Sequence, residues 1–150
     1  MGTKKKKEQI KQVGEQTNKE WKVILYETKA GKSPVNDFIA TLTQNEKDWM
    51  AVCMEQLKKE GYKIRRPQAD YLRDDIYELR IQLRGRKKAR TLYFFCYDDY
   101  IVLTHTFIKR TKEVPSKEIE KAIKYKNTFL EKYNINNIEE AYYASGFHKI

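Results

Sequence analysis

The clearest pattern of apolar and polar residues lies between residues 77 and 83, where the two kinds alternate. Alternation with a period of two is typical of a strand that buries one face. Residues 90–97 and 100–110 also favour strands, and 90–97 is apolar on both faces. The segment "LRGRKKA" separates the first two strands, and Asp98 with Asp99 favours a tight turn before the third. The pattern therefore predicts a three-stranded antiparallel meander.

Helical spacing of apolar residues marks three other segments. Ser33 and Pro34 favour the start of a first helix, because serine caps helices and proline fits their first turn. Asn45 is the expected cap of a second helix, which Gly61 ends, and Pro115 opens a third. The first helix has one apolar face, and the second has an inward face: Val35, Phe38, Ile39 and Leu42; and Met50, Cys53, Met54 and Leu57. In the third helix the residues that recur at helical spacing are Ile119, Ala122, Ile123, Lys126, Leu130 and Tyr133.

Three remaining segments complete the order of elements. Residues 21–27 are apolar on both faces and predict a well-covered strand, 62–76 are interpreted as a connection, and 136–144 favour a short helix. The order β-α-α-β-β-β-α predicts an α+β fold, in which a small, mostly antiparallel sheet carries its helices on one face. The other face would then be a binding surface, on which the strand at 77–83 displays Glu78, Arg80 and Gln82.

The length of 150 residues fits one domain, predicted to span 21–150, after a polar, basic arm at 1–20 that favours disorder or a loose helix. No apolar run approaches the roughly 20 residues of a membrane span, and the arm lacks the apolar part of a secretory signal. We therefore expect a cytoplasmic protein without a membrane segment. Cys53 and Cys96 are expected to be reduced thiols, and neither a metal nor another cofactor is expected.

Positive charge is concentrated in two parts of the chain, which has a formal net charge of +10. Residues 1–22 hold seven lysines and three glutamates, and residues 80–112 hold nine lysines and arginines against two aspartates. The remainder is nearly balanced. A polyanion is the natural partner of such a distribution, and RNA or DNA is the commonest one. For the N-terminal lysines alone, a solubilising surface is the favoured explanation.

Residues 74–122 contain a series of motifs in a specific order: "YELR", then "GR" and "RTLYFF", then "HTFIKRTKEVP", then a helix. With "WKVILYETKAGKSPVNDFIATL" upstream, the chain from about 21 to 130 resembles the phage-derived, HigB-like branch of the RelE/ParE toxin superfamily. The resemblance implies a RelE-like fold and a type II toxin–antitoxin toxin. Such toxins cut mRNA, usually in the ribosomal A site, and are neutralised by a small antitoxin, often of the helix-turn-helix type. The resemblance does not extend to the arm.

The resemblance implies a metal-independent mRNA endoribonuclease, in which the ribose 2′-OH attacks the adjacent phosphate. Its partners would be mRNA, the ribosome and a cognate antitoxin. Such a reaction needs a base, an acid and cations that stabilise the phosphorane. Arginine binds phosphate well but is a poor base, so lysine, tyrosine or histidine would have to move protons.

The resemblance places basic catalytic residues on two neighbouring strands and at the end of the last strand. Arg80 and Arg90 are the first candidates for binding the phosphate, although each could instead pair with Glu78 or a nearby acid. Arg90 shares a strand face with Leu92 and Phe94, so it lies either at the strand edge or buried with a partner. Lys109 and Lys112 are the further catalytic candidates. Arg110, between Lys109 and Lys112, is expected to contact RNA. The turn cations Arg84, Arg86, Lys87 and Lys88 are expected either to contact RNA backbone phosphates or simply to be solvated.

His105 and Tyr93 each fit either a functional role or the core. His105 titrates near neutrality and is a catalytic candidate, but it alternates with Leu103 and Phe107, and a histidine on an apolar face is more often a core residue. Tyr93 could donate a proton or stack on an RNA base, although core packing explains it equally simply.

A second hypothesis is a non-nuclease toxin or binding module on the same fold, either a ParE-like inhibitor of gyrase or a nucleic-acid binder. Fold alone does not fix function. The concentration of positive charge favours the hypothesis of an mRNA endoribonuclease.

Overall fold

The computed structural model describes residues 19–145, so most of the predicted arm lies outside the described residues. The strands are β1 (Lys22–Leu25), β2 (Ala69–Arg73), β3 (Ile76–Gln82), β4 (Lys88–Cys96) and β5 (Tyr100–Ile108). The helices are α2 (Pro34–Ile39), α3 (Gln44–Glu60), α4 (Ser116–Lys132) and α5 (Ile138–Ser145). Two short 3₁₀ turns, η1 (Gly61–Lys63) and η2 (Arg84–Arg86), complete the described elements.

The five strands form one sheet in the order β1-β5-β4-β3-β2. The β1–β5 pair is parallel, and the other three pairs are antiparallel. The predicted α+β class and mostly antiparallel sheet are therefore confirmed, as is the short helix near the C-terminus. The interpretation of 62–76 as a connection was wrong, because 69–73 form the edge strand β2. Only Ala69 of that strand is fully buried, so its sequence carries little alternation.

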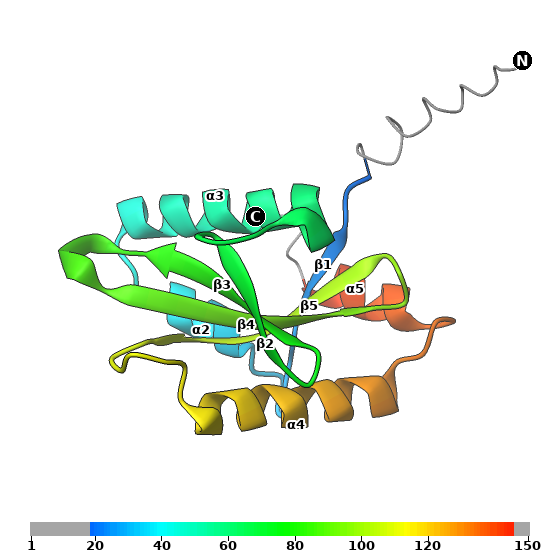
Figure 1. Ribbon diagram of the computed structural model, residues 1–150. Helices are drawn as coiled ribbons and strands as arrows, with labels where there is room; N and C mark the ends of the chain where they lie inside the picture. Colours follow the sequence, from blue (N-terminus) through cyan, green and yellow to red (C-terminus); the bar gives the residue numbers. More distant parts are fainter. Residues whose placement is uncertain (1–18, 146–150) are drawn as a thin grey trace, which may run out of the picture.

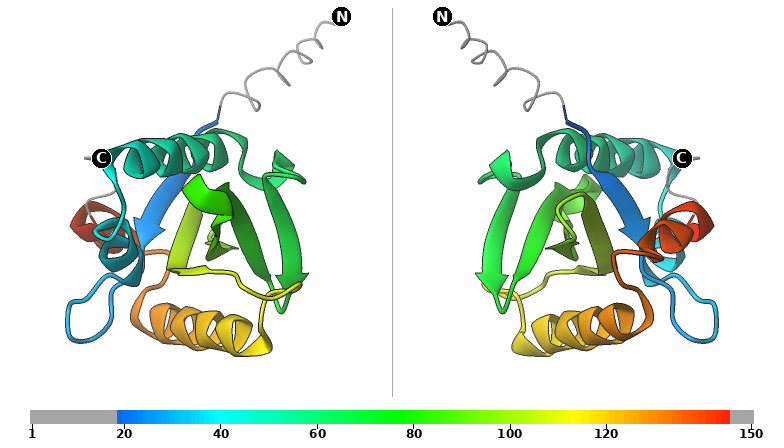
Figure 2. Two further views of the ribbon diagram at one scale, coloured as in Figure 1. Left: turned by 90° about the vertical axis from the view of Figure 1, so that its left-hand side faces the viewer. Right: turned by 90° about the vertical axis from the view of Figure 1, so that its right-hand side faces the viewer.

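Helices cover both faces of the sheet, so the expectation of helices on one face was wrong. Figure 1 shows α3 above the sheet and α4 below it, and the two side views of Figure 2 agree. The α3-side cluster joins α2 and α3 to alternate residues of the sheet, among them Val23, Leu79 and Tyr93. The α4-side cluster joins α4 and α5 to the intervening residues, among them Ile24 and Leu92. The physical reason is that β1, β4 and β5 are apolar on both faces, and each face needs cover.

A bulge in β5 reverses the face of one candidate residue. Leu92 of β4 pairs with His105, but its neighbour Tyr93 pairs with Leu103, so Thr104 is an extra residue. The Thr104 hydroxyl donates to the carbonyl oxygen of Leu92 at 3.0 Å and fixes the bulge. Leu103 therefore packs in the α3-side cluster, whereas His105 turns toward α4. The expected common face of residues 103, 105 and 107 was wrong for this reason.

The start of α3 differs from the prediction by two residues. Thr43, not Asn45, is the N-cap, and its side chain accepts the Glu46 N–H while the Glu46 carboxylate accepts the Thr43 N–H. Gly61 ends α3 as predicted, with a φ of 52° that favours glycine. A Cβ atom on Gly61 would also collide with the indole of Trp21. These two ends set how α3 lies across the sheet.

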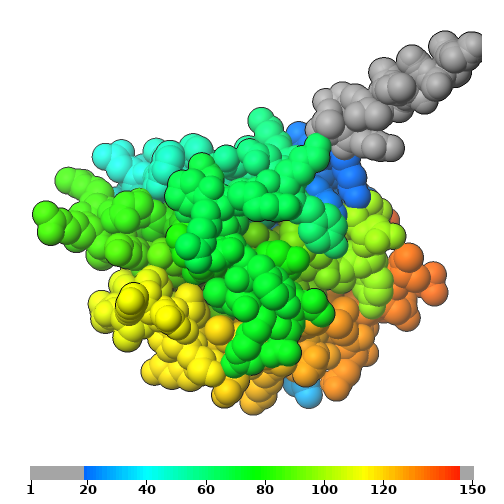
Figure 3. All heavy atoms as spheres, viewed as in Figure 1, coloured from blue at the N-terminus to red at the C-terminus, as the bar shows by residue number. Residues whose placement is uncertain are grey.

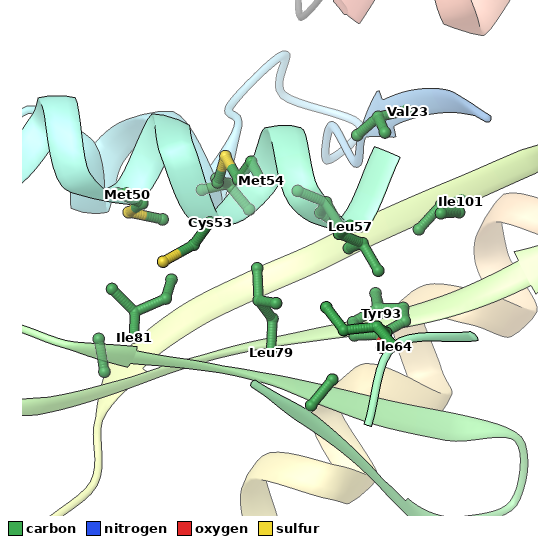
Figure 4. Packing of buried hydrophobic residues seen from close by; sticks show 14 of the residues in the cluster. Val23, Met50, Cys53, Met54, Leu57, Ile64, Leu79, Ile81, Tyr93 and Ile101 are labelled. Atoms are coloured by element: carbon green, nitrogen blue, oxygen red, sulfur yellow. The ribbon is translucent and has the colours of Figure 1, made fainter. Parts of the chain in front are cut away.

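Packing of α3 on the sheet makes up most of one core. In Figure 4, Met50, Cys53 and Leu57 point from α3 toward Leu79, Ile81 and Tyr93 of the sheet. The predicted inward face of this helix is thereby confirmed. Burial of such side chains is the main favourable contribution to folding, at roughly 25 cal/mol per Å² of apolar surface.

Replacing Leu57 with alanine tests this packing. Leu57 is fully buried, so Leu57→Ala should lower the free energy of unfolding by about 2–5 kcal/mol, measured by urea denaturation. Val52, on the same helix but exposed, is the matched control, and Val52→Ala should change it by less than about 0.5 kcal/mol. Equal losses in the two variants would contradict the packing of α3.

Candidate functional site

Glu78 lies between two arginines on the α4 side of the sheet. Arg80 of β3 and Arg90 of β4 are directly opposite each other in the strand register. The Arg80 Nε donates to Glu78 Oε2 at 3.1 Å, and the Arg90 Nε lies 3.0 Å from Glu78 Oε1. Like charges opposite each other destabilise a sheet, so a carboxylate between them is what allows the two arginines to coexist. We call these three residues the Glu78 cluster.

Burial differs sharply within the Glu78 cluster. Glu78 is 3% exposed and Arg90 is 7% exposed, whereas the Arg80 side chain keeps 28% of its surface open. Arg90 and Glu78 form an ion pair, but the geometry at Arg90 Nε is not that of a hydrogen bond. The hydrogen bond that Arg90 makes is from its Nη1 to the carbonyl oxygen of Ala89. Burial lowers the pKa of Arg90, and Glu78 counteracts that shift. Arg90 is thus held inside, and Arg80 presents charge to solvent.

A groove of about 350 Å³ opens beside Arg80, between the β2–β3 edge and the segment that leads into α4. Figure 3 shows this segment (yellow) beside the strands of the edge (green). The residues lining the groove carry five cations and three carboxylates: Arg66, Arg73, Arg80, Lys109, Lys112, Asp70, Glu78 and Glu113. Tyr71, Leu72, Val114 and Ile119 complete the lining. The groove is therefore concave and carries an excess of positive charge.

Lys109 and Lys112 both line the groove, as does Arg80, so the structure brings these three candidates together. Lys109 follows β5, and its Nζ donates to the carbonyl oxygens of Thr111 (3.0 Å) and Lys112 (2.7 Å). These bonds fold the Lys109 side chain over its own loop. Desolvation lowers the pKa of Lys109, and the positive charges of Arg90 and Lys88 lower it further.

Two cations of the groove come from β2 and its approach, which the sequence analysis did not single out. The Arg66 Nη2 lies 2.7 Å from Asp70 Oδ2, and Arg73 bonds to Asp74 and to the Ser116 hydroxyl. Burial alone would raise the pKa of Asp70, but Arg66 and the Tyr71 N–H hold it below its usual value. In the sequence, the feature that pointed to these two cations was the high content of charged residues in 62–76.

His105 and Tyr93 lie away from the groove. The ring of His105 is buried against α4, with Nε2 3.0 Å from Glu118 Oε1 and Nδ1 3.0 Å from the Thr104 hydroxyl. Tyr93 is 0% exposed in the α3-side cluster, and its desolvated hydroxyl has a pKa well above the usual value. Both side chains are buried and neither lines the groove, which counts against a catalytic role for His105 and against base stacking by Tyr93.

The remaining basic candidates are exposed but do not line the groove. Arg84 and Arg86 are in η2, Lys87 and Lys88 follow it, and Arg110 follows β5. Lys87 is anchored, since its Nζ lies 3.3 Å from Glu46 Oε2 at the start of α3. Arg84, Arg86, Lys87 and Lys88 form a second positive region at the tip of the β3–β4 hairpin, which is on the left in Figure 1.

Neither cysteine forms a disulfide: Cys53 is buried and Cys96 is half-buried. Burial raises the pKa of the Cys53 thiol to about 11 and that of Cys96 to about 12, so both favour the unreactive thiol form. Within residues 19–145, no three histidine, cysteine, aspartate or glutamate side chains are grouped as metal ligands would be. In the same part of the chain, no helix has both the length and the apolar character needed to span a membrane.

A family model described as "Phage derived protein Gp49-like (DUF891)" matches residues 37–127, more than half of the chain. The chain therefore belongs to this family, which is a RelE/HigB-like family of toxins in toxin–antitoxin systems. No curated protein matches the chain. Every residue that lines the groove lies inside the matched segment.

Removing the charge of Glu78 should destabilise the fold, because Arg90 would be left buried without a counter-charge. We expect Glu78→Gln to lower the free energy of unfolding by about 3 kcal/mol in urea denaturation. Adding Arg90→Met should restore part of this loss, since the buried cation is then also gone. Additive losses in the double variant would contradict the pairing.

The buried His105 should make stability depend on pH. Its pKa is lowered chiefly by burial, although Glu118 raises it in part and Lys121 lowers it. The unfolded chain therefore binds a proton that the folded chain resists, so stability should fall as the pH drops through about 6.5. Urea denaturation between about pH 7.5 and pH 5.5 measures this slope, which should be smaller in His105→Gln. An unchanged slope in the variant would show that other groups cause it.

Proposed function

We propose that this protein is a toxin that cuts mRNA, as a metal-independent endoribonuclease acting on ribosome-bound mRNA in the cytoplasm. The observation that carries the proposal is the groove, in which Arg80, Lys109 and Lys112 converge in a member of a toxin family. Concave sites with several cations suit a phosphodiester, whose charge increases in the transition state.

Arg80 is the proposed phosphate-binding residue. Glu78 engages its Nε, which leaves the Nη groups as the donors directed at a ligand. A guanidinium whose orientation is fixed in advance binds a phosphate through two parallel hydrogen bonds at little entropic cost. Lys112, exposed at the rim of the groove, would add a second charge to the same phosphate.

Arg90 was a candidate for binding the phosphate on sequence grounds, but the proposal gives it a different role. Because it is 7% exposed and paired with Glu78, it positions the carboxylate that orients Arg80. We therefore assign Arg90 a positioning role and not direct contact with RNA. Its charge still contributes to the field in the groove, as its effect on the pKa of Lys109 indicates.

Lys109 is the proposed proton-transfer group. Its lowered pKa makes the neutral amine more accessible near neutral pH than that of an ordinary lysine. A neutral Lys109 could accept the 2′-OH proton, and a charged one could protonate the leaving 5′-oxygen. Unlike the guanidinium of Arg80, the amine of Lys109 can lose its proton, and Lys109 also lines the groove.

The cations outside the groove have a longer-range role. Arg84, Arg86, Lys88 and Arg110 are exposed and would attract the backbone of mRNA or ribosomal RNA. Membership of the family supports an antitoxin as a further partner, and we propose one of the helix-turn-helix type.

Replacing Arg80 tests this function directly. Arg80→Ala should reduce mRNA cleavage by about 100-fold or more, because one stabilising donor for the transition state is lost. The measurement is primer extension on cellular mRNA after induction of the protein. Arg80→Lys should recover only part of the activity, since lysine keeps the charge but loses the planar fork.

Lys124 provides the control for charge, because it is exposed on α4 and does not line the groove. Lys124→Ala should cleave as the wild type does, and thermal unfolding should confirm that all variants are folded. Growth arrest by the wild-type protein with intact transcripts would overturn the nuclease proposal and favour a ParE-like or binding function.

A further inference from the structure

A second hollow, of about 270 Å³, lies at the tip of the β3–β4 hairpin and is lined by Asn45, Glu46, Trp49, Gln82, Leu83 and Arg84. Its main apolar surface is the indole of Trp49 on α3, which is 48% exposed. Tryptophan buries more area than other side chains when it is covered, so leaving half of it open suggests a ligand. The proposed mRNA cleavage does not use this hollow.

The wall of the hollow is held in place by polar contacts. The Glu46 carboxylate accepts the Thr43 N–H of the helix cap and pairs with Lys87 Nζ at 3.3 Å. Gln82 Nε2 donates to the Leu83 and Lys87 carbonyl oxygens, across the mouth of the turn. The turn that carries Arg84 is therefore fixed beside Trp49 before any ligand binds.

Charge around the hollow selects the kind of ligand. Arg84, Arg86 and Lys88 are exposed nearby, whereas the acidic residue of the lining, Glu46, is buried and already paired. An exposed aromatic ring surrounded by cations is the arrangement that binds single-stranded nucleic acid, because bases stack on the ring and phosphates meet the cations. A neutral or basic protein segment would not gain from this charge.

We propose that the hollow binds one unpaired base of single-stranded RNA, stacked on Trp49, with Arg84 on an adjoining phosphate. Gln82 lies two residues along β3 from Arg80 and on the same face, a distance of about 7 Å along the strand. Trp49 itself is on α3, whereas the groove lies on the α4 side of the sheet, so the hollow is a binding site separate from the groove. The inference rests on the proposed RNA function for its biological meaning, but the binding is a separate property.

The test is fluorescence titration of the full-length protein with a 2′-O-methyl oligoribonucleotide of about eight nucleotides, which 2′-OH attack cannot cleave. Binding should change the tryptophan emission, because Trp49 is half-exposed whereas Trp21 is buried. Trp49→Phe should retain most of the affinity, measured by anisotropy of a labelled oligonucleotide, but lose the emission change. Trp49→Ala should weaken binding by about tenfold.

Val52→Ala is the matched control, because Val52 is 53% exposed one turn further along α3 and does not line the hollow. It should bind as the wild type does. Wild-type affinity in Trp49→Ala, an emission change that persists in Trp49→Phe, or no oligonucleotide binding at all would each overturn the inference.

The two proposals fail in different ways. If the wild-type protein shows Trp49-dependent binding but leaves transcripts intact, the inference stands and the nuclease proposal fails. If cleavage depends on Arg80 but Trp49→Ala binds normally, only the inference fails.

Discussion

The pairing of Glu78 with Arg80 and Arg90 is the interaction on which the candidate site depends. The strand register places two guanidinium groups directly opposite each other on one face of the sheet. Without a carboxylate between them, that register would be opposed by charge repulsion and by the cost of burying Arg90. With Glu78 present, one arginine becomes part of the interior and the other is directed into the groove. The fold can therefore keep a cation oriented at its surface.

The position of α4 completes the groove. Glu118, in the first turn of α4, reaches the buried His105 of β5, and Ser116 accepts a hydrogen bond from Arg73 of β2. These contacts fix the loop that carries Lys109 and Lys112 relative to the sheet. His105 thus has a structural role at the helix–sheet contact, and the bulge at Thr104 makes that role possible.

Much of the fold could be predicted from the sequence, because alternation marked β3 and helical spacing marked α3 and α4. Because residues 90–97 are apolar on both faces, helices are needed on both faces of the sheet, although they were expected on one face only. Two features had no clear signal. The bulge inserts one residue into β5 without changing its composition, and β2 buries only Ala69 fully. Since β2 was missed, so were Arg66 and Arg73.

The residue types of the candidate site could be predicted from the sequence, but not which residue is exposed in the groove and which is buried. Sequence alternation placed Arg90 on one strand face with Leu92 and Phe94, either at the strand edge or buried with a partner, and the packing shows that it is buried beside Glu78 while Arg80 is partly exposed. Trp49 escaped notice because nothing in the sequence distinguishes an exposed tryptophan on a helix from a buried one. Depth of burial is set by contacts between distant segments, such as the turn after β3 and the start of α3.

The central claim is that RNA bound in the groove is cut by attack of a ribose 2′-OH on the adjacent phosphate. Its most direct test is the chemistry of the ends produced when purified protein cuts RNA, alone or with ribosomes. In-line attack by the 2′-oxygen breaks the bond to the 5′-oxygen, so the upstream fragment should end in a 2′,3′-cyclic phosphate or its hydrolysis product. The downstream fragment should begin with a 5′-hydroxyl. Fragments with a 3′-hydroxyl and a 5′-phosphate, or no cleavage under either condition, would contradict the account.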